Sequence, residues 1–420
     1  MSIEKPQDPA ALSAGRQPRS RAIDLLRGTA ILLVIGCHYV VAPGSAGMLT
    51  PVAQLWYRIG WAGVDLFFVL SGFLVSGLLF AEFQRHQRVD MKRFLVRRGL
   101  KIWPAYFAYL LFLAGWLLAH RSKGSHWEDL WPNLLHLQNY FGSPRVHTWS
   151  LAVEEHFYLV AAAVWTLFLT PRRIGGVHRL FPIVAVFGLL AVALARQLEF
   201  ARGGRESLNL FATHLRFDGL LMGTLLAYLT HFVPERMSWC RQRPWACLAA
   251  GVLLAAPVLW LTPDHDAGSA GAGLGLMYVG FALVVLGVIN LEQPAQRSRH
   301  LFATLPARAL ARMGVFSYGI YLWHVDLAQT PMKKIAALVA NAHLPGWATW
   351  LGVTALYVAF AFLVGAMMSR LIEMPVLALR DRLFPSKTGL AQPVPAASTL
   401  PVEAVAGRQP LARTSSALGT

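Results

Sequence analysis

Charged residues are scarce in this chain of 420 residues. Asp, Glu, Lys and Arg make up only 14% of it, apolar residues make up 55%, and the mean hydropathy is +0.46. Apolar runs of roughly 20 residues, long enough to cross a bilayer as a helix, recur along the chain. The composition therefore favours a helical membrane protein over a soluble one.

Cysteine is also rare, with only three residues, Cys37, Cys240 and Cys247. Their spacing fits neither a metal site nor a disulfide framework. Cys37 adjoins His38, but neighbouring side chains on a helix point about 100° apart, so we interpret Cys37 as a packing residue rather than half of a catalytic dyad. No Gly-x-Ser-x-Gly motif supports a serine nucleophile. No small-residue cleavage site follows the first apolar run, so we expect no cleaved signal peptide.

The apolar runs predict an all-α, polytopic bundle of about ten transmembrane helices. The predicted spans are 23–43, 59–80, 103–119, 150–170, 179–196, 208–230, 244–262, 269–290, 312–329 and 347–370, of which the sixth and ninth carry several polar residues. With this count, the loops of one side hold about 26 of the 38 Lys and Arg residues and the opposite loops about 8. By the positive-inside rule, both termini are then cytoplasmic.

The net charge of +17 comes from the Lys and Arg residues that are concentrated in the loops of one side. In a soluble protein it would suggest nucleic acid, but here it follows the membrane topology, and we expect no nucleic-acid partner. We divide the chain into a cytoplasmic polar tail (1–20), a transmembrane domain (21–384) and a cytoplasmic tail (385–420). The composition of the last segment, rich in Pro, Ala and Ser, predicts disorder.

The first predicted span carries two ionisable residues on one face. Arg27 and His38 are eleven residues apart, almost three helical turns, so both project from one stripe about 16 Å apart along the axis, and Asp24 falls close to it. Such groups are costly at membrane depth and usually face a bundle interior or a water-filled cavity. His38 is the best candidate base, because its ordinary pKa of about 6.5 allows proton uptake at neutral pH. The alternative is a structural histidine bonded to a backbone carbonyl.

A second ionisable group, Asp65, lies within the apolar run 63–74. A carboxylate there must be paired or protonated. The predicted spans place Asp65 at a depth similar to His38 and Glu154, which favours a catalytic role. A structural ion pair or a helix-start cap is the alternative. Ser71 and Gly72 are expected to allow close helix packing.

The cytoplasmic start of the third span is strongly basic. Arg97 and Arg98, with Lys101 one turn later, form a compact cationic cluster. Such a cluster could hold a phosphorylated donor such as a nucleotide. The simpler interpretation assigns these charges to topology and lipid headgroups.

The fourth span begins with Trp149 and Ser150. Ser150 suits a helix N-cap, and Glu154 lies one turn inside the helix. A cap would explain one acid, but not Glu154, Glu155 and His156 together. Polar or aromatic residues recur in the preceding outer loop and in later spans, where they suit an interfacial belt, a sugar-stacking surface or polar lining. These residues are Trp127, Trp131, His136, Tyr140 and His147, and then His214, Arg216, Asp218, Tyr318, Tyr321, His324 and Asp326.

These segments together resemble the acyltransferase-3 family of integral membrane acyltransferases. The matching pieces, in chain order, are Asp24-Leu-Leu-Arg-Gly with His38, Gly63-Val-Asp-Leu-Phe-Phe-Val-Leu-Ser-Gly-Phe-Leu, Arg97-Arg with Ile102 and Pro104, Trp149-Ser-Leu with Glu154, Phe157-Tyr-Leu, and Tyr318-Gly-Ile-Tyr-Leu-Trp-His. They extend over nearly the whole predicted membrane domain, and the ordered set is quite specific.

The resemblance implies a core of about ten spans that moves an acyl group, commonly acetyl, from acyl-CoA to a carbohydrate or related hydroxyl. It implies that His38 and Arg27 are essential, that the basic cluster serves the CoA end and that Glu154 belongs to the site. Lys101 departs from the arginine usual in the family; a lysine keeps the charge but loses the bidentate fork. No permanently bound cofactor is implied, only acyl-CoA as a co-substrate.

We therefore expect a multi-pass O-acyltransferase in a bacterial-type inner membrane. His38 would act as general base or transient acyl carrier, with Arg27, Glu154 and Asp65 as its catalytic partners. The phosphates of acyl-CoA would bind Arg97, Arg98 and Lys101. The acceptor, a saccharide or glycolipid of the cell envelope, would meet residues of the fourth and ninth spans, namely Trp149, Ser150, Tyr318 and His324. The acceptor's identity, the acyl chain length and a homo-oligomeric state are left open.

Two other classes of function fit the same charges. A transporter or exporter of a small acid or glycolipid would use them along a permeation path, although the sequence shows no paired inverted repeats or matching interrupted helices. A purely structural membrane subunit is the third alternative. It predicts that His38→Ala leaves the phenotype intact, whereas an enzyme would lose activity with normal expression.

Overall fold

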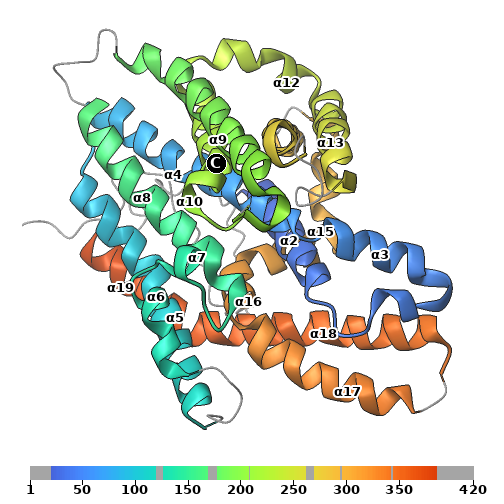
Figure 1. The fold of residues 1–420 in the computed structure, drawn as a ribbon. Coiled ribbons are helices and arrows are strands. Elements are labelled where there is room, and N and C mark those ends of the chain that lie inside the picture. Colours follow the sequence, from blue (N-terminus) through green and yellow to red (C-terminus); the bar gives the residue numbers. More distant parts are fainter. Residues whose placement is uncertain are drawn as a thin grey trace, which may run out of the picture.

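The computed structural model describes residues 20–119, 126–168, 177–207, 209–261, 269–293, 296–341 and 344–385. All regular secondary structure in these ranges is helical, and the helices pack into a bundle (Figure 1). The predicted polar tails, 1–20 and 385–420, lie outside the described residues apart from Ser20 and Pro385.

The longer helices are α2 (Arg21–Cys37), α3 (Thr50–Ile59), α4 (Ala62–His86), α5 (Met91–Ala119), α8 (Trp149–Phe168), α9 (Val177–Ser207), α11 (Asp218–Phe232), α13 (Pro244–Leu261), α14 (Leu274–Leu291), α15 (Leu305–Val315), α17 (Thr330–Ala340), α18 (Gly346–Met368) and α19 (Met374–Leu383). The shorter ones are α6 (Trp131–Leu134), α7 (Gln138–Phe141), α10 (Thr213–Arg216), α12 (Ser238–Gln242) and α16 (Ser317–Trp323). Short 3₁₀ segments are η1 (Pro43–Ser45), η2 (Gly47–Leu49), η4 (Trp127–Leu130), η5 (Val146–Thr148), η7 (Pro234–Met237) and η9 (Arg297–Ala303), and π-helical turns are η8 (Ser269–Gly273), η10 (His324–Gln329) and η11 (Ser369–Glu373).

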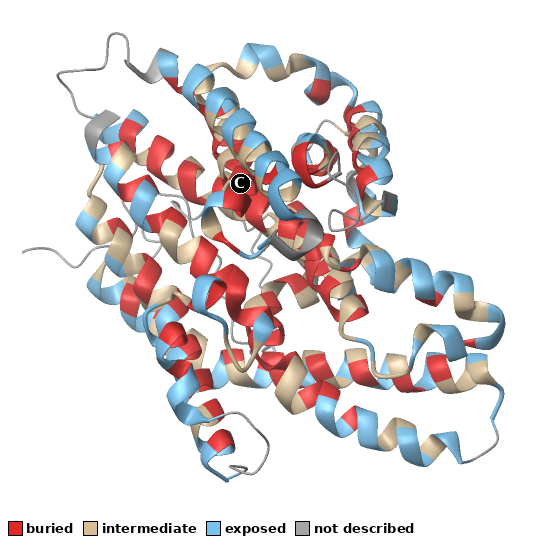
Figure 2. Cartoon of the chain, viewed as in Figure 1, coloured by how far each residue is buried: buried red, intermediate tan, exposed pale blue. Residues whose placement is uncertain are grey.

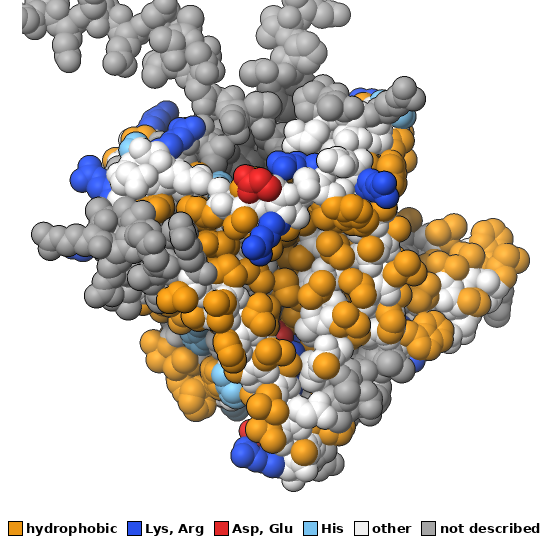
Figure 3. Space-filling model, turned by 90° about the horizontal axis from the view of Figure 1, so that it is seen from above, with side chains coloured by type: hydrophobic (Ala, Val, Ile, Leu, Met, Phe, Trp, Pro, Cys, Tyr) orange, Lys and Arg blue, Asp and Glu red, His pale blue; other side chains and the backbone are white. Residues whose placement is uncertain are grey.

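In the part of the chain that the structure describes, five helical stretches are long and apolar enough to cross a membrane. They are Ala62–His86, Met91–Ala119, Leu180–Gly203, Ala270–Leu291 and Gly346–Leu383, and the pair Pro234–Gln242 and Pro244–Trp260, bent by 96°, makes a sixth if counted as one span. Apolar side chains cover most of the face in Figure 3, with Lys and Arg gathered toward one edge. The number of ten spans and the side of the termini stay predictions.

Three predicted spans differ from the helices that occupy them. The run 208–230 is divided between α10 and α11, with a break at Phe217, and the run 312–329 is divided among α15, α16 and η10, with a break at Phe316. The polar residues of the runs 208–230 and 312–329 lie around these two breaks. The chain there does not form one continuous apolar helix. The first predicted span, 23–43, is too long, because α2 ends at Cys37.

Side chains from distant segments cap both ends of α2. At its start, Ser20 accepts from a backbone N–H within the first turn, and the Glu292 carboxylate accepts from the N–H groups of Arg21 and Ala22, at 2.7 and 3.1 Å. At its end, the Gln329 amide donates to the carbonyls of His38 and Tyr39, at 2.8 and 3.1 Å. These contacts supply the partners that helix termini leave free, so the chain turns away after Cys37 and His38 stands at the helix end.

Glycines let the central helices approach closely. A methyl group at Gly72 of α4 would overlap the Leu220 carbonyl of α11, and one at Gly223 of α11 would overlap the Val69 carbonyl of α4. The prediction that Gly72 serves close packing is confirmed. Buried residues gather where helices of the bundle face one another (Figure 2), and small residues at such crossings let apolar helices pack by van der Waals contact alone.

Gly72→Ala is expected to destabilise the protein by about 1–3 kcal/mol, because the added methyl group meets backbone rather than a mobile side chain. Gly115→Ala, also on a helix, is the matched control, since no other described part of the chain lies within 4 Å of a methyl group there. Thermal unfolding in detergent should show a lower Tm for Gly72→Ala alone. Equal melting temperatures for the two variants would contradict the close crossing.

Candidate functional site

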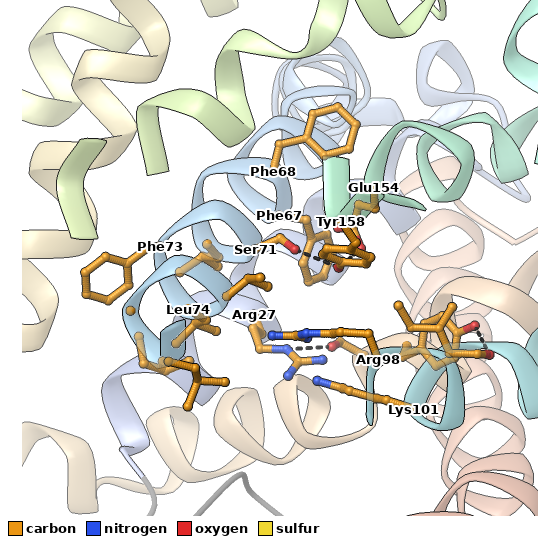
Figure 4. A pocket seen from close by; sticks show the side chains of 18 of the residues that line it. Arg27, Phe67, Phe68, Ser71, Phe73, Leu74, Arg98, Lys101, Glu154 and Tyr158 are labelled. Carbon is orange, nitrogen blue, oxygen red and sulfur yellow. Dashed lines mark hydrogen bonds between the residues drawn. The ribbon is translucent and has the colours of Figure 1, made fainter. Parts of the chain in front are cut away.

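A cavity of about 380 Å³ lies among α2, α4, α5, α8 and α16. The α4 wall is mainly apolar and includes Phe67, Leu70 and Leu74. The opposite side carries polar groups from the other helices, and Figure 4 shows how these side chains converge. Six of the residues predicted from the sequence to form the site line this cavity: Arg27, Arg98, Lys101, Ser150, Glu154 and Tyr318.

Three cations reach this cavity from two helices. Arg27 of α2 donates from Nε to the Ser317 hydroxyl at 3.2 Å. The Arg98 guanidinium lies 5.3 Å from the centroid of the Tyr158 ring, and Lys101 projects from the next turn of α5 toward both arginines (Figure 4). Within the described ranges none of the three forms an ion pair with a carboxylate. Their N–H donors therefore remain available to an anionic ligand.

Two acids interact electrostatically with these cations, although neither forms an ion pair with them among the described residues. Glu154 accepts a hydrogen bond from the Tyr158 hydroxyl at 2.8 Å, and that hydroxyl lies 3.0 Å from the Ser71 hydroxyl (Figure 4). Glu373, in the π-helical turn η11, accepts from the Ser369 hydroxyl at 3.0 Å and interacts electrostatically with Lys101. The cavity thus combines an apolar wall, a cationic group and acids held in place by hydroxyl groups.

Arg97 does not line the cavity. Its guanidinium pairs with Asp381 of α19 at 3.0 Å and donates to the Phe384 carbonyl. Consecutive residues on a helix point about 100° apart, so Arg98 faces the cavity while Arg97 faces α19. The predicted donor role of Arg97 stays a prediction, without support from its contacts.

A layer of hydroxyl groups from α8 and α16 forms part of the cavity wall. The Ser150 and Tyr321 hydroxyls are 2.7 Å apart, and Tyr321 also donates to the backbone carbonyl of His147. Tyr318 lines the cavity one turn earlier on α16 and donates to the Ile102 carbonyl at 2.8 Å. Ser150 and Tyr318 are therefore part of the cavity wall, and their predicted contact with the acceptor stays a prediction.

Three histidines lie beyond this layer. The ring centroids of His38 and His324 are 4.8 Å apart, those of His147 and His324 are 5.5 Å apart, and those of His38 and His147 are 6.4 Å apart. His147 and His324 are buried, whereas His38 is partly exposed. The predicted residues His38 and His324 thus come together, outside the cavity that holds Arg27.

The hydrogen bonds of His38 define its protonation pattern. Its Nδ1 lies 2.9 Å from the Val34 carbonyl, which can only accept, so Nδ1 carries the hydrogen and Nε2 keeps the lone pair of a base. The Nδ1 of His324 likewise faces the Ile320 and Tyr321 carbonyls, at 3.1 and 2.8 Å. His38 is therefore bonded to a backbone carbonyl and still has its basic nitrogen available.

His147 stands on the loop before α8, in η5. Burial, together with repulsion from His38 when that ring is protonated, lowers the pKa of His147 to about 3. It stays neutral at neutral pH and presents an uncharged ring to His38. Within the described ranges no set of three His, Cys, Asp or Glu side chains could hold a metal ion.

Asp65 belongs to a buried ion-pair network. Its carboxylate accepts from Arg216 at 2.5 Å and from the Tyr278 hydroxyl at 2.7 Å, and all three groups are buried. Trp149 also joins this network, because the Arg216 guanidinium lies 5.3 Å from its ring centroid. Asp65 and Trp149 therefore do not line the cavity, and their predicted roles as catalytic and acceptor residues stay predictions.

Several groups of this site escaped the sequence interpretation. His147 was assigned only to the outer aromatic loop, although it stands two residues before Trp149. Glu373 follows the long apolar stretch of α18, where an acid is unexpected, and that position was the available signal. Gln329 fixes the backbone of His38, but nothing in its local sequence points there. For the other aromatic residues of this loop, both predicted roles remain: an interfacial belt and a sugar-stacking surface.

Comparison with known proteins gives a consistent picture. A family model described as an acyltransferase domain matches residues 20–369. The chain is 28% identical, over 84% of its length and 55% of the relative's, to the peptidoglycan O-acetyltransferase OatA of Listeria monocytogenes. It is 28% identical, over 74% of its length and 49% of the relative's, to the putative peptidoglycan O-acetyltransferase YrhL of Bacillus subtilis. For the O-acetyltransferase OatA of Staphylococcus aureus the identity is 26%, over 65% of this chain and 46% of the relative.

The chain spans about half the length of the curated relatives it matches. No solved structure matches it significantly. The family match extends over α2 to α18, and so includes both the cavity and the three histidines. This protein therefore belongs to the acyltransferase-3 family of membrane acyltransferases.

Proposed function

We propose that this protein is a membrane-embedded O-acyltransferase that moves an acetyl group from acyl-CoA to a hydroxyl group of an envelope saccharide. The observation that carries the proposal is the convergence of Arg27, Arg98 and Lys101, without paired carboxylates, in a cavity with an apolar wall. Acyl-CoA has this same division, with phosphates at one end and a long uncharged arm at the other.

The donor would enter from the cytoplasmic side, where the basic loops are predicted to lie. Its phosphates would bind Arg98 and Lys101, and Arg27 would guide the arm along the apolar wall of α4. Lys101 supplies a point charge rather than a planar fork, so Arg98 is the better partner for a phosphate held by two hydrogen bonds. Glu154 and Glu373 would keep the three cations oriented.

His38 would serve as the general base. Its Nε2 would take the proton of the acceptor hydroxyl while the hydroxyl oxygen attacks the thioester carbonyl carbon. The new C–O bond forms, the C–S bond breaks, and the CoA thiolate leaves and is protonated. A transient acyl group on His38 is the covalent alternative, in which the ring nitrogen attacks first.

Peptidoglycan is the first acceptor to test, because two of the relatives are named as peptidoglycan O-acetyltransferases, one of them as putative. Membranes containing the full chain would be given radiolabelled acetyl-CoA and muropeptides. Release of CoA with label in the muropeptides supports the proposal. Label in another envelope glycan would keep the reaction and change the acceptor. No consumption of acetyl-CoA or of a longer acyl-CoA would leave transport as the better interpretation.

Arg98→Gln is expected to raise the KM for acetyl-CoA about 10- to 100-fold, because it removes a charge-assisted hydrogen bond to the donor. Arg97→Gln on the same turn is the matched comparison and should change KM far less, since Arg97 pairs with Asp381. Initial rates against acetyl-CoA concentration measure both. A larger effect at Arg97 would favour the donor site predicted from the sequence over the cavity.

A further inference from the structure

The three histidines lie outside the donor cavity, and Tyr321 contacts both. The cavity is lined by Arg27, Arg98 and Lys101 and also by Ser150 and Tyr321, whereas His38 is not among its lining residues. On the far side, the Tyr321 ring centroid lies 5.8 Å from that of His147 and 6.1 Å from that of His324. Tyr321 therefore stands between the cavity and the histidine rings.

We propose that Tyr321, held by Ser150 and the His147 carbonyl, is a gate between the donor cavity and His38, and that it keeps the thioester from water until an acceptor is bound. This inference rests on the proposed acyl transfer. The acyl group must pass the layer that Tyr321 closes, because the cationic group that would hold CoA and the base lie on opposite sides of it. Tyr321 is a positioning residue, and no bond to it is formed.

The gate is the movable part of this layer. The loop that presents the His147 carbonyl is anchored on both sides, by the ion pair of Arg145 with Asp326 at 2.6 Å and by the donation of Gln138 to the Thr148 carbonyl at 2.9 Å. The Tyr321 side chain, in contrast, makes its hydrogen bonds through one hydroxyl group, and its ring is otherwise held by packing against His147 and His324. Loss of those bonds would leave the ring held by packing alone, while the loop keeps both of its anchors.

The neighbouring backbone is suited to such a movement. Tyr321 lies in the short helix α16, which begins after the break at Phe316 and passes at His324 into the π-helical turn η10. A π-helical turn widens the helix locally and is frequent at functional sites. The gate residue thus stands on the part of this span whose helix is least regular.

An open gate has a defined chemical consequence. Water that reaches the thioester attacks its carbonyl carbon, the C–O bond forms, the C–S bond breaks, and acetate, a proton and the CoA thiol are released. This hydrolysis consumes the same donor without labelling an acceptor. The number of acetyl groups on the acceptor per CoA released therefore reports how well the gate closes.

The test uses the full chain in membranes, with radiolabelled acetyl-CoA and muropeptides or, if these are not labelled, the glycan fraction that wild type labels. Tyr321→Phe removes only the hydroxyl group. We expect it to raise CoA release without acceptor by about 5- to 30-fold over wild type, the factor that loss of one or two hydrogen bonds gives. The acetyl groups transferred per CoA released should fall accordingly.

Two further variants keep the test decisive. Ser150→Ala removes one of the two bonds and should shift the ratio in the same direction by a smaller factor. Tyr357→Phe is the matched control: this buried tyrosine of α18 lies outside the cavity, and its hydroxyl has no hydrogen-bond partner among the described residues. Its ratio should equal that of wild type.

The possible failures differ from one another. An unchanged ratio in Tyr321→Phe and Ser150→Ala, with folded protein, overturns the gate and leaves the acyltransferase intact. Loss of both CoA release and transfer in folded Tyr321→Phe also overturns it, because the hydroxyl would then act in the reaction itself. A wild-type protein that never releases CoA from any acyl donor overturns the proposed function, and the gate with it.

Discussion

Replacing His38 by alanine is expected to lower acyl transfer by about 10²- to 10⁴-fold, the range for loss of a general base, with unchanged protein level. The Nε2 of this ring is the basic nitrogen, since Nδ1 is committed to the Val34 carbonyl. Of the two histidines beside it, His324 is fully buried, and the pKa of His147 is too low. Transfer of label from acetyl-CoA to the acceptor measures the loss.

His86→Ala, an exposed histidine in the last turn of α4, controls for removal of an imidazole in general. It should transfer at the wild-type rate. Normal transfer by folded His38→Ala would count against the base and favour the structural alternative. Rapid acid quenching of the wild type separates the two routes, because only the covalent one leaves label on the enzyme.

Composition and periodicity predicted most of the fold. Length and hydropathy marked a helix under each of the ten predicted spans, because burial in a bilayer demands long apolar runs. They did not give the end of α2, which depends on Gln329, a residue 291 positions away from His38 in the chain. They also did not give the breaks at Phe217 and Phe316, where tertiary contacts replace a continuous helix.

Part of the candidate site could be predicted, because the spacing of residues along a helix determines which side chains share a face. Helical spacing selected Arg27, Arg98, Lys101 and Glu154, and all four meet in the cavity. Spacing could not separate Arg98 from Arg97, because the choice depends on where α19 packs. The order of the motifs along the chain also gave no sign that the three histidines and the donor cavity are separate, since that separation is a property of side-chain contacts.

The two π-helical turns beside the site show what a local pattern leaves out. The turn η10 carries His324 and Gln329, which contact the ring and the backbone of His38, and η11 carries Glu373 beside the cations. Both turns interrupt otherwise regular helices, which is frequent at functional sites. Each half of the site is thus next to a widened turn, and the sequence contains no separate signal for either.

Asp65→Ala is expected to destabilise the protein by about 3–5 kcal/mol, because it leaves the buried Arg216 guanidinium without its partner. Asp65, Arg216 and Tyr278 are all buried, and the ion pair is short at 2.5 Å. Thermal unfolding in detergent should show a large fall in Tm, and transfer should fall with the amount of folded protein. The control is a triple variant, Asp65→Leu, Arg216→Met and Tyr278→Phe, which leaves no polar group unpaired.

The triple variant decides between the two interpretations of Asp65. Replacing a whole buried ion pair by apolar groups of similar volume is often neutral or stabilising, so this variant should regain most of the lost stability. If Asp65 is structural, transfer returns with folding. A triple variant that folds but does not transfer would instead show that the carboxylate sets the charge state of the site, as predicted from its depth beside His38 and Glu154. Because Asp65 contacts Arg216 and Tyr278 and does not line the donor cavity, we expect transfer to return.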